Sequence, residues 1–161
     1  MMRLWSAESC KWLDEYSLPD KAPLIDFDFD EGKVKLLVPS KTCVVGLVGS
    51  RICIWRRLGT RDIFSSREGL FTKGLCMRYV DPQAVVGNED GKVRVFDMYS
   101  RKISQIIKMH PGAVSSISFS DEQLIVSGSS LGTIAISDLS SDQQVATLGT
   151  TSSAGCVVNL I

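Results

Sequence analysis

The sequence predicts an all-β fold made of short antiparallel strands that recur with a fixed period. Runs rich in Val and Ile return every 41 residues, and polar turns containing glycine separate them. The segments between these runs show no long stretch with helical periodicity. Together, these three observations favour a series of small antiparallel sheets over any helical or mixed architecture.

The period is carried by three segments that align without gaps, 46–55, 87–96 and 128–137. Their first residues Gly46, Gly87 and Gly128 are separated by 41 residues each time, and so are their last residues Trp55, Phe96 and Ser137. A fixed step between matched residues is the sequence signature of a repeat architecture.

Each unit contains four predicted strands, two of which enclose a short turn that begins after the repeated glycine. A third strand lies upstream, as in 75–79 and 114–119, and a fourth lies downstream, as in 102–107 and 144–148. Four strands in about 40–45 residues are typical of one propeller blade. We expect a single incomplete domain over 1–161, with a partial blade at each end and repeats at roughly 12–55, 63–97 and 103–138.

Two N-terminal segments fit the period less simply. The segment 4–18 reads as a strand, a turn and a strand, because its turn matches in length the one after Phe96, although an amphipathic helix is the rival interpretation. A surplus of nine residues over the period lies between Phe29 and Gly46, and the segment 32–42 within it is either a loop insertion or a stretch of unrelated origin.

Charge and composition favour a folded intracellular protein. Eighteen basic and eighteen acidic residues cancel, so no long-range field attracts nucleic acid or an anionic membrane. The apolar run 43–49 is too short to span a bilayer, and residues 1–11 lack the apolar core of a signal peptide. The five cysteines have no paired spacing, so we interpret them as reduced and mostly buried, in a cytoplasmic or nuclear protein.

The repeat resembles the WD-repeat family. The pattern is His110, the strand 114–119, Ser127-Gly128, a glycine turn, and an Ile-x-Ile-x-Asp ending at Asp138. Phe96-Asp97 and Ser137-Asp138 stand where that family usually has Trp-Asp. The amino-acid sequence at 51–57, 95–101 and 128–136 is similar to that of plant F-box/WD-repeat proteins. The resemblance implies a partial WD-repeat β-propeller, an open arc of four-stranded antiparallel blades.

The family's blades are pinned by a hydrogen-bonded set of His, Ser or Thr, Asp and Trp, and no blade here has all four. The second blade has Asp90, but Val86 stands at the position of Ser or Thr and Phe96 at that of Trp. The third blade has His110 and Ser127, but Leu131 stands at the position of Asp and Ser137 at that of Trp. We therefore expect these blades to depend on apolar packing, and we interpret His110 as structural rather than as a base or a metal ligand.

A closed ring needs four to eight blades, so we expect the chain to be part of a longer propeller protein. An open arc exposes two apolar flanks and unpaired strand edges. We therefore expect marginal stability and self-association unless a partner completes the arc.

The residue patterns of the sequence predict neither a catalytic site nor a metal site. The run 26–30 alternates Asp and Phe, but Glu31 and Leu37 occupy the positions where a calcium loop needs Gly and Glu. We interpret it as a strand with a solvated acidic face and a buried aromatic face. Because there is one histidine, no metal-ligand cluster and no phosphate-binding loop, we expect no enzyme activity, no metal and no cofactor.

The predicted function is a protein-interaction scaffold, because binding residues concentrate on loops held by rigid strands. If the F-box kinship holds, the parent protein would be a substrate receptor of a ubiquitin ligase. An assembly-only protein that pairs through its open edges is the alternative. We expect other proteins as partners, and neither nucleic acid nor membrane. The candidate contact residues are Asn88, Glu89, Asp90, Ser129, Ser130, Leu131, Arg56 and Arg57.

Overall fold

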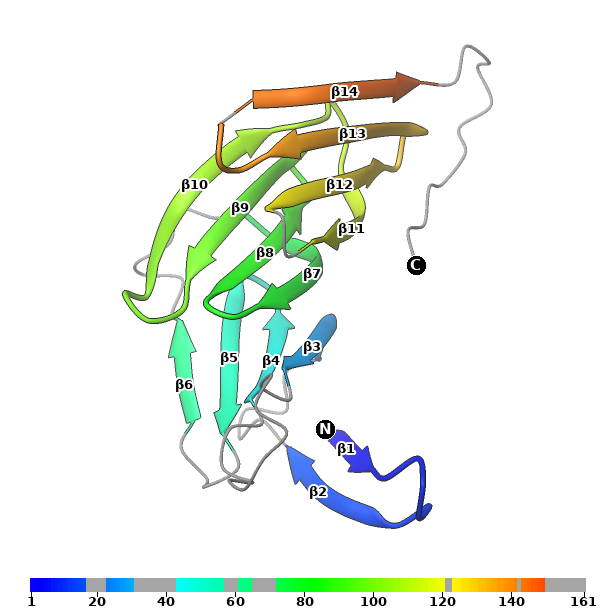
Figure 1. Cartoon of the computed structure of the whole chain (residues 1–161), viewed down its shortest axis with the longest axis vertical. Helices are drawn as coiled ribbons and strands as arrows, with labels where there is room; N and C mark the ends of the chain where they lie inside the picture. The colour runs from blue at the N-terminus through cyan, green and yellow to red at the C-terminus, as the bar shows by residue number, and fades with distance from the viewer. Residues whose placement is uncertain are drawn as a thin grey trace.

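In the computed structural model, the described residues form three four-stranded antiparallel sheets and one hairpin (Figure 1). It describes residues 1–16, 23–30, 43–56, 61–64, 72–120, 123–141 and 143–149. Within each sheet the strands follow the order of the chain, so each sheet is a simple meander. The all-β prediction of four-stranded, unclosed sheets is confirmed.

The strand bounds are as follows. The hairpin is β1 (Met2–Trp5) and β2 (Trp12–Tyr16); the first sheet is β3 (Asp26–Asp30), β4 (Cys43–Val48), β5 (Arg51–Arg56) and β6 (Arg61–Phe64); the second is β7 (Gly74–Val80), β8 (Gln83–Asn88), β9 (Lys92–Asp97) and β10 (Lys102–Lys108); the third is β11 (Val114–Phe119), β12 (Leu124–Ser129), β13 (Thr133–Asp138) and β14 (Gln143–Gly149).

The sheets stack face to face in an arc. β7 packs against β3 and β4 on one side and against β11 on the other. The first strand of each sheet (β3, β7 and β11) lies along one side of the arc, while the last strands β6, β10 and β14 lie along the other (Figure 1). Each predicted repeat therefore begins with the last strand of one sheet and ends with the third strand of the next.

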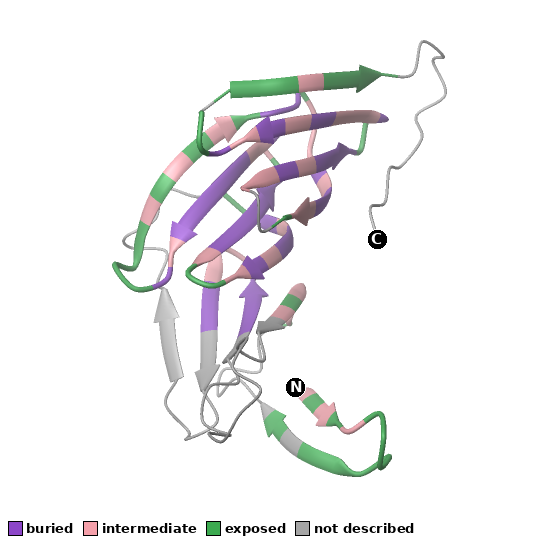
Figure 2. Cartoon of the chain, in the orientation of Figure 1, coloured by how far each residue is buried: buried purple, intermediate pink, exposed green. Residues whose placement is uncertain are grey.

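The two spaces between the sheets hold the core. Leu47 and Ile52 of the first sheet meet Met77 and Val86 of the second. The opposite face of the second sheet, with Val85, Val93 and Val95, meets Ile117 and Ile125 of the third. All these side chains are 0% exposed, and Figure 2 shows the buried residues along the central strands with exposed ones along β10 and β14. Apolar burial on both faces of the second sheet makes it the centre of the fold.

The first sheet has a shorter turn than the other two. β4 and β5 are joined by two residues, Gly49 and Ser50, whereas β8–β9 and β12–β13 are each joined by three. Gly87 and Gly128 therefore lie opposite Val93 and Ile134, while Gly46 lies opposite Cys53, one position further along the strand. Because a shift of one residue moves a side chain to the other face, Gly46 is out of step with the other two glycines.

Close packing of sheets explains why position 87 is glycine. A Cβ atom built there would lie 2.6 Å from Cys76 Sγ and 2.6 Å from Val114 Cγ1. Burial, together with the nearby Asp26 carboxylate, raises the pKa of the Cys76 thiol to about 12. That cysteine is an inert apolar side chain at the interface, in agreement with the interpretation of the cysteines as buried and reduced, although Cys10 is exposed.

The N-terminal segment forms a hairpin in which Met2 pairs with Tyr16 and Trp5 with Trp12. The strand–turn–strand prediction is therefore confirmed over the helix. Residues 32–42 lie outside the described residues, so neither interpretation of that insertion is tested.

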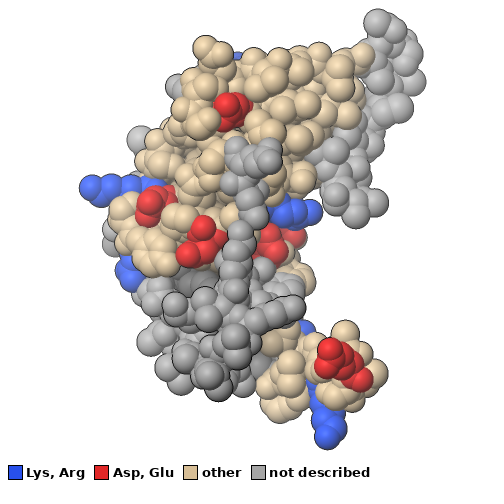
Figure 3. Space-filling view, in the orientation of Figure 1, with Lys and Arg blue, Asp and Glu red and all other residues tan. Residues whose placement is uncertain are grey.

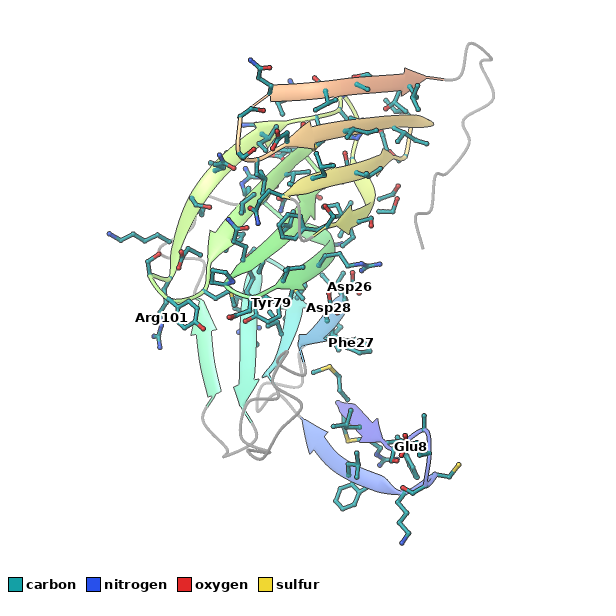
Figure 4. The ribbon with its side chains drawn as sticks, viewed as in Figure 1. Glu8, Asp26, Phe27, Asp28, Tyr79 and Arg101 are labelled. Carbon is teal, nitrogen blue, oxygen red and sulfur yellow. The ribbon has the colours of Figure 1, made fainter. Side chains whose placement is uncertain are left out.

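The acidic strand β3 shows that the predicted assignment of its faces was wrong. Phe27 is 52% exposed, and the half-buried Asp26 and Asp28 face the second sheet (Figure 4). Asp26 Oδ2 accepts the backbone N–H of Met77 at 2.8 Å, and Asp28 Oδ2 accepts that of Tyr79 at 2.8 Å. These N–H groups lie on the edge of β7 that β8 does not use, so the carboxylates supply acceptors at an otherwise open strand edge.

Replacing Asp28 with alanine is expected to destabilise the chain by about 1–2 kcal/mol, because the amide of Tyr79 loses its acceptor. Asp28→Asn keeps an oxygen at the same place and is expected to recover most of the loss. Urea denaturation measures both variants, and amide exchange of Tyr79 reports the bond itself. Unchanged exchange at Tyr79 in the alanine variant would contradict the assignment.

Candidate functional site

The turns between strands form two opposite faces of the arc. One, the Gly91 face, comprises the turns 49–50, 89–91 and 130–132 and the connections 72–73 and 109–113. The other, the Tyr99 face, comprises the turns 81–82 and 98–101 and the described residues 120, 123 and 139–141. Backbone bonds tie the turns of each face together, as when Met109 and His110 donate to the Gly91 carbonyl, or when Met98 donates to that of Pro82.

The predicted partner contacts at 88–90 and 129–131 lie on the Gly91 face, and their exposure differs. Glu89 and Ser130 are exposed, and Leu131 is 58% exposed. Asn88 and Ser129, by contrast, are 0% exposed. Arg56 ends β5, but its side chain and all of Arg57 lie outside the described residues.

The two buried residues hold the turns in place. Asn88 Nδ2 donates to the carbonyl of Thr72 at 3.1 Å, which joins the β8–β9 turn to the incoming connection. The hydroxyl of Ser129 accepts the N–H of Leu131 at 3.1 Å. Leu131 itself lies over Gly112, where a Cβ would come within 2.6 Å of its Cγ. The available contact surface of these two turns is therefore their tips.

Asp90 forms an ion pair that sequence reasoning missed. Its carboxylate accepts two bonds from the Arg94 guanidinium, at 3.1 and 3.0 Å, and one from the N–H of Lys92 at 3.2 Å. The hydrogen bond from Arg94 is the largest cause of a pKa for Asp90 below its usual value. The Arg94 side chain is 4% exposed, so Asp90 neutralises a buried cation. The spacing of four residues across a tight turn is the signal that could have revealed this pair.

His110 lies at the centre of a buried hydrogen-bonded set. It is 2% exposed; its Nε2 lies 2.9 Å from Ser127 Oγ and its Nδ1 lies 2.7 Å from Thr133 Oγ1. Ser127 Oγ also lies 3.5 Å from the carbonyl of Ala135. A neutral imidazole with its proton on Nε2 satisfies this set, because it then donates to Ser127 and accepts from Thr133. Thr133, two residues after Leu131, thus donates its hydroxyl hydrogen to Nδ1 and supplies the partner that the Leu131 side chain cannot.

Protonation of His110 is expected to weaken the fold in acid. Burial lowers the pKa of His110, with a smaller opposing effect from Ser127. The unfolded chain, with a histidine pKa of about 6.5, then binds more protons than the folded chain, so stability falls as pH drops below about 6.5 and is level above it. Urea denaturation between pH about 7.5 and about 5 measures how steeply the free energy of unfolding depends on pH. The slope should be smaller in a His110→Asn variant; an equal slope in both proteins would contradict this origin.

Asp97 and Asp138, which are 41 residues apart, cap equivalent turns on the Tyr99 face. Asp97 Oδ1 accepts the N–H groups of Tyr99 at 2.9 Å and Ser100 at 2.8 Å. Asp138 accepts from the backbone N–H of Ser140 at 2.8 Å and from its hydroxyl at 2.6 Å. These bonds lower the pKa of both carboxyls. The aspartate of the repeat thus has a turn-forming role.

The repeat position that holds Trp55, Phe96 and Ser137 is filled by a different residue type in each sheet. Phe96 is 2% exposed and belongs to the core between the first and second sheets. Ser137 is 1% exposed, and its hydroxyl has no hydrogen-bond partner within the part of the chain that the structure describes. The side chain of Trp55 lies outside the described residues.

Charged side chains of both signs are intermixed on the surface shown in Figure 3, without a large area of one sign. Among the described residues, no group of three or more His, Cys, Asp or Glu side chains is arranged to hold a metal ion. In the same part of the chain, no helix is long and apolar enough to cross a membrane.

Comparisons with known proteins agree with this geometry. No family model matches the chain. An F-box/WD-40 repeat-containing protein of Arabidopsis thaliana is 57% identical over an alignment of 167 positions, which includes 96% of this chain and 37% of that protein. The chain thus spans a little over a third of that relative's length.

Two solved structures show the same fold at low identity. The crystal structure of the RRP9 WD40 repeats matches with a TM-score of 0.65 and 13% identity, covering 81% of this chain and 39% of that one. The computationally designed Ika4 protein matches with a TM-score of 0.64 and 22% identity, covering 83% of this chain and 77% of that one. The stacked sheets are therefore those of WD40 propellers, in part.

Proposed function

Because the chain belongs to the WD-repeat family of β-propeller proteins, we propose that it is a non-catalytic, intracellular scaffold that binds other proteins through the turns of its sheets. One observation carries the proposal: the tips of the Gly91 face are exposed while the residues beside them are locked. Glu89 is exposed beside the buried Asn88, and Leu131 is exposed beside the buried Ser129. Side chains presented on a rigid base bind without a large ordering cost.

We further propose that the chain is the substrate-recognition part of an F-box ubiquitin-ligase receptor. The identity of 57% to a protein named for an F-box and WD-40 repeats supports this. In this arrangement the sheets select the target protein. Arg56 and Arg57 remain candidate contacts in addition to the tips.

Chemical cross-linking with mass spectrometry tests the scaffold proposal. We expect a protein of different sequence to be cross-linked to the tagged chain, and to be lost when Glu89, Ser130 and Leu131 are all changed to alanine. A variant with Val145→Lys and Leu148→Lys on β14 is the matched control, because these side chains are 62% and 59% exposed but belong to neither turn face. If the partner is lost only from the β14 variant, the turns are not its binding surface.

The alternative is an assembly role, in which the chain pairs with another chain through an open sheet face. Val126, Ile134 and Ile136 on the outer face of the third sheet are partly exposed, whereas their equivalents Val85, Val93 and Val95 are 0% exposed. Apolar side chains left open in this way favour association. Light scattering over a range of concentrations tests it: a dimer abolished by Leu148→Lys favours assembly, and a monomer throughout contradicts it.

A further inference from the structure

Tyr99 is an exposed aromatic side chain at the β9–β10 turn. It is 70% exposed, and the equivalent residue of the third sheet, 41 positions later, is Ser140. The aromatic ring therefore does not belong to the repeated framework of the sheets. Its role must be sought in its own surroundings on the Tyr99 face.

Hydrogen bonds hold Tyr99 at both ends while its ring stays open to solvent. Its N–H donates to Asp97 Oδ1 at 2.9 Å, and its hydroxyl lies 3.3 and 3.2 Å from the two carboxylate oxygens of Asp81. Asp81 is itself positioned by the hydroxyl of Tyr79, at 2.7 Å from its Oδ1. Tyr79 is largely buried, at 7% exposed, so this chain of bonds anchors the exposed ring to the core.

A ring fixed in this way is suited to contact another protein. A free tyrosine on a surface loses rotamer freedom when it is bound, and Tyr99 has already lost part of that freedom. Tyrosine and arginine are also the residues most often found at the energetic centre of protein interfaces. Arg101, two residues further on, is exposed and has a left-handed backbone with φ of 59°.

The charges around Tyr99 indicate the chemistry of the ligand. The carboxylates of Asp81 and Asp97 both accept hydrogen bonds within the face. Arg101 and Lys102 are exposed cations that follow Tyr99 closely in the chain, with Arg101 in the turn (labelled in Figure 4) and Lys102 at the start of β10. A complementary ligand therefore combines an apolar ring with a carboxylate.

We propose that the Tyr99 face of the β7–β10 sheet is a docking surface for an extended protein segment that stacks an aromatic or proline ring on Tyr99 and places a carboxylate beside Arg101. This inference rests on the proposed scaffold function and names a second surface for it, opposite the Gly91 face. The two surfaces differ in the residues that a partner would need.

A displayed library of random peptides, selected on the immobilised full chain, tests the proposal. We expect the enriched peptides to share a ring and an acidic residue close together. Tyr99→Ala is expected to weaken their binding by about tenfold or more, because it removes a central aromatic contact. Tyr99→Phe retains the ring but loses the bond to Asp81, so a smaller loss, about two- to threefold, is expected.

Leu131→Ala is the matched control on the opposite face, and thermal denaturation of each variant monitors folding. Peptides whose binding is unchanged by Tyr99→Ala overturn the inference; if Leu131→Ala abolishes that binding, the scaffold function stands on the Gly91 face alone. A selection that enriches no peptide overturns the inference as well. Capture of a protein partner in the cross-linking experiment would still support the scaffold function in that case.

Discussion

Replacing Gly91 with alanine is expected to destabilise the chain by about 3–4 kcal/mol, among the largest effects of a single substitution. Gly91 has φ of +77°, and a Cβ atom there would lie 2.1 Å from the carbonyl oxygen of His110 and 2.7 Å from that of Gly112. Both obstacles are backbone atoms, so no side chain can move aside. The carbonyl of Gly91 also accepts the N–H groups of Met109 and His110, so any shift at the turn displaces the connection that carries His110.

Gly49→Ala is the matched control for this prediction. Gly49 has a similar φ of +62°, but among the described residues no atom beyond Gly49 and its two chain neighbours lies within 4 Å of the position of its Cβ. Only the backbone cost remains, about 1–2 kcal/mol. Urea denaturation of the two variants under the same conditions measures the difference. Equal losses would show that the Gly91 turn does not lie against the connection 109–113.

Replacing Asp90 with asparagine is expected to destabilise the chain by about 2–4 kcal/mol, because the buried Arg94 loses its counter-charge. Asparagine can still accept the N–H of Lys92, so the turn itself is conserved and the effect of the charge is isolated. Since the pKa of Asp90 is lowered in the folded state, this stabilisation is present above the unfolded carboxyl pKa of about 3.9 and is lost as pH falls below it.

A double-mutant cycle with Arg94→Met measures the pair. Methionine fills a similar volume without a charge, so adding Asp90→Asn to Arg94→Met is expected to cost less than about 1 kcal/mol. The free energy of unfolding from urea titrations gives all four corners of the cycle. If Asp90→Asn costs the same in both backgrounds, the two side chains are not coupled.

The repeat could be predicted from the sequence because the residues that recur are strand residues, and the fold buries them between the sheets. Val85, Val93 and Val95 read as strand residues and are buried as such. The position of Gly46 could not be predicted, because a turn one residue shorter leaves the spacing of 41 intact in the sequence while it shifts the ladder by one position. Alignment without gaps detects the period but not the register.

The faces of the acidic strand could not be predicted for a different reason. Alternation separates Asp26 and Asp28 from Phe27, but it does not say which set faces a neighbour. The usual preference puts Phe inside, and it was overridden because the open edge of β7 offers two N–H groups that only an acceptor can satisfy. Such partners come from 51 residues away, and no local pattern identifies them.

The candidate site was predicted as a location but not as a set of contacts. The turns 88–90 and 129–131 do lie at one end of the sheets. Burial of Asn88 and Ser129, the ion pair of Asp90, and the role of Thr133 beside His110 all depend on how separate segments meet. The role of Tyr99 could not be predicted from the sequence, because it depends on the bonds from its hydroxyl to Asp81.

Methyl contacts measured by NMR test the stacking of the sheets most directly. With isoleucine, leucine, valine and methionine methyl groups labelled, the second sheet should show contacts on both faces. Val86 and Met77 should contact Leu47, whereas Val93 and Val95 should contact Ile117 and Ile125. A spectrum in which one valine set contacts both neighbours, or in which either set contacts none, would mean that the sheets do not stack in chain order about a common axis.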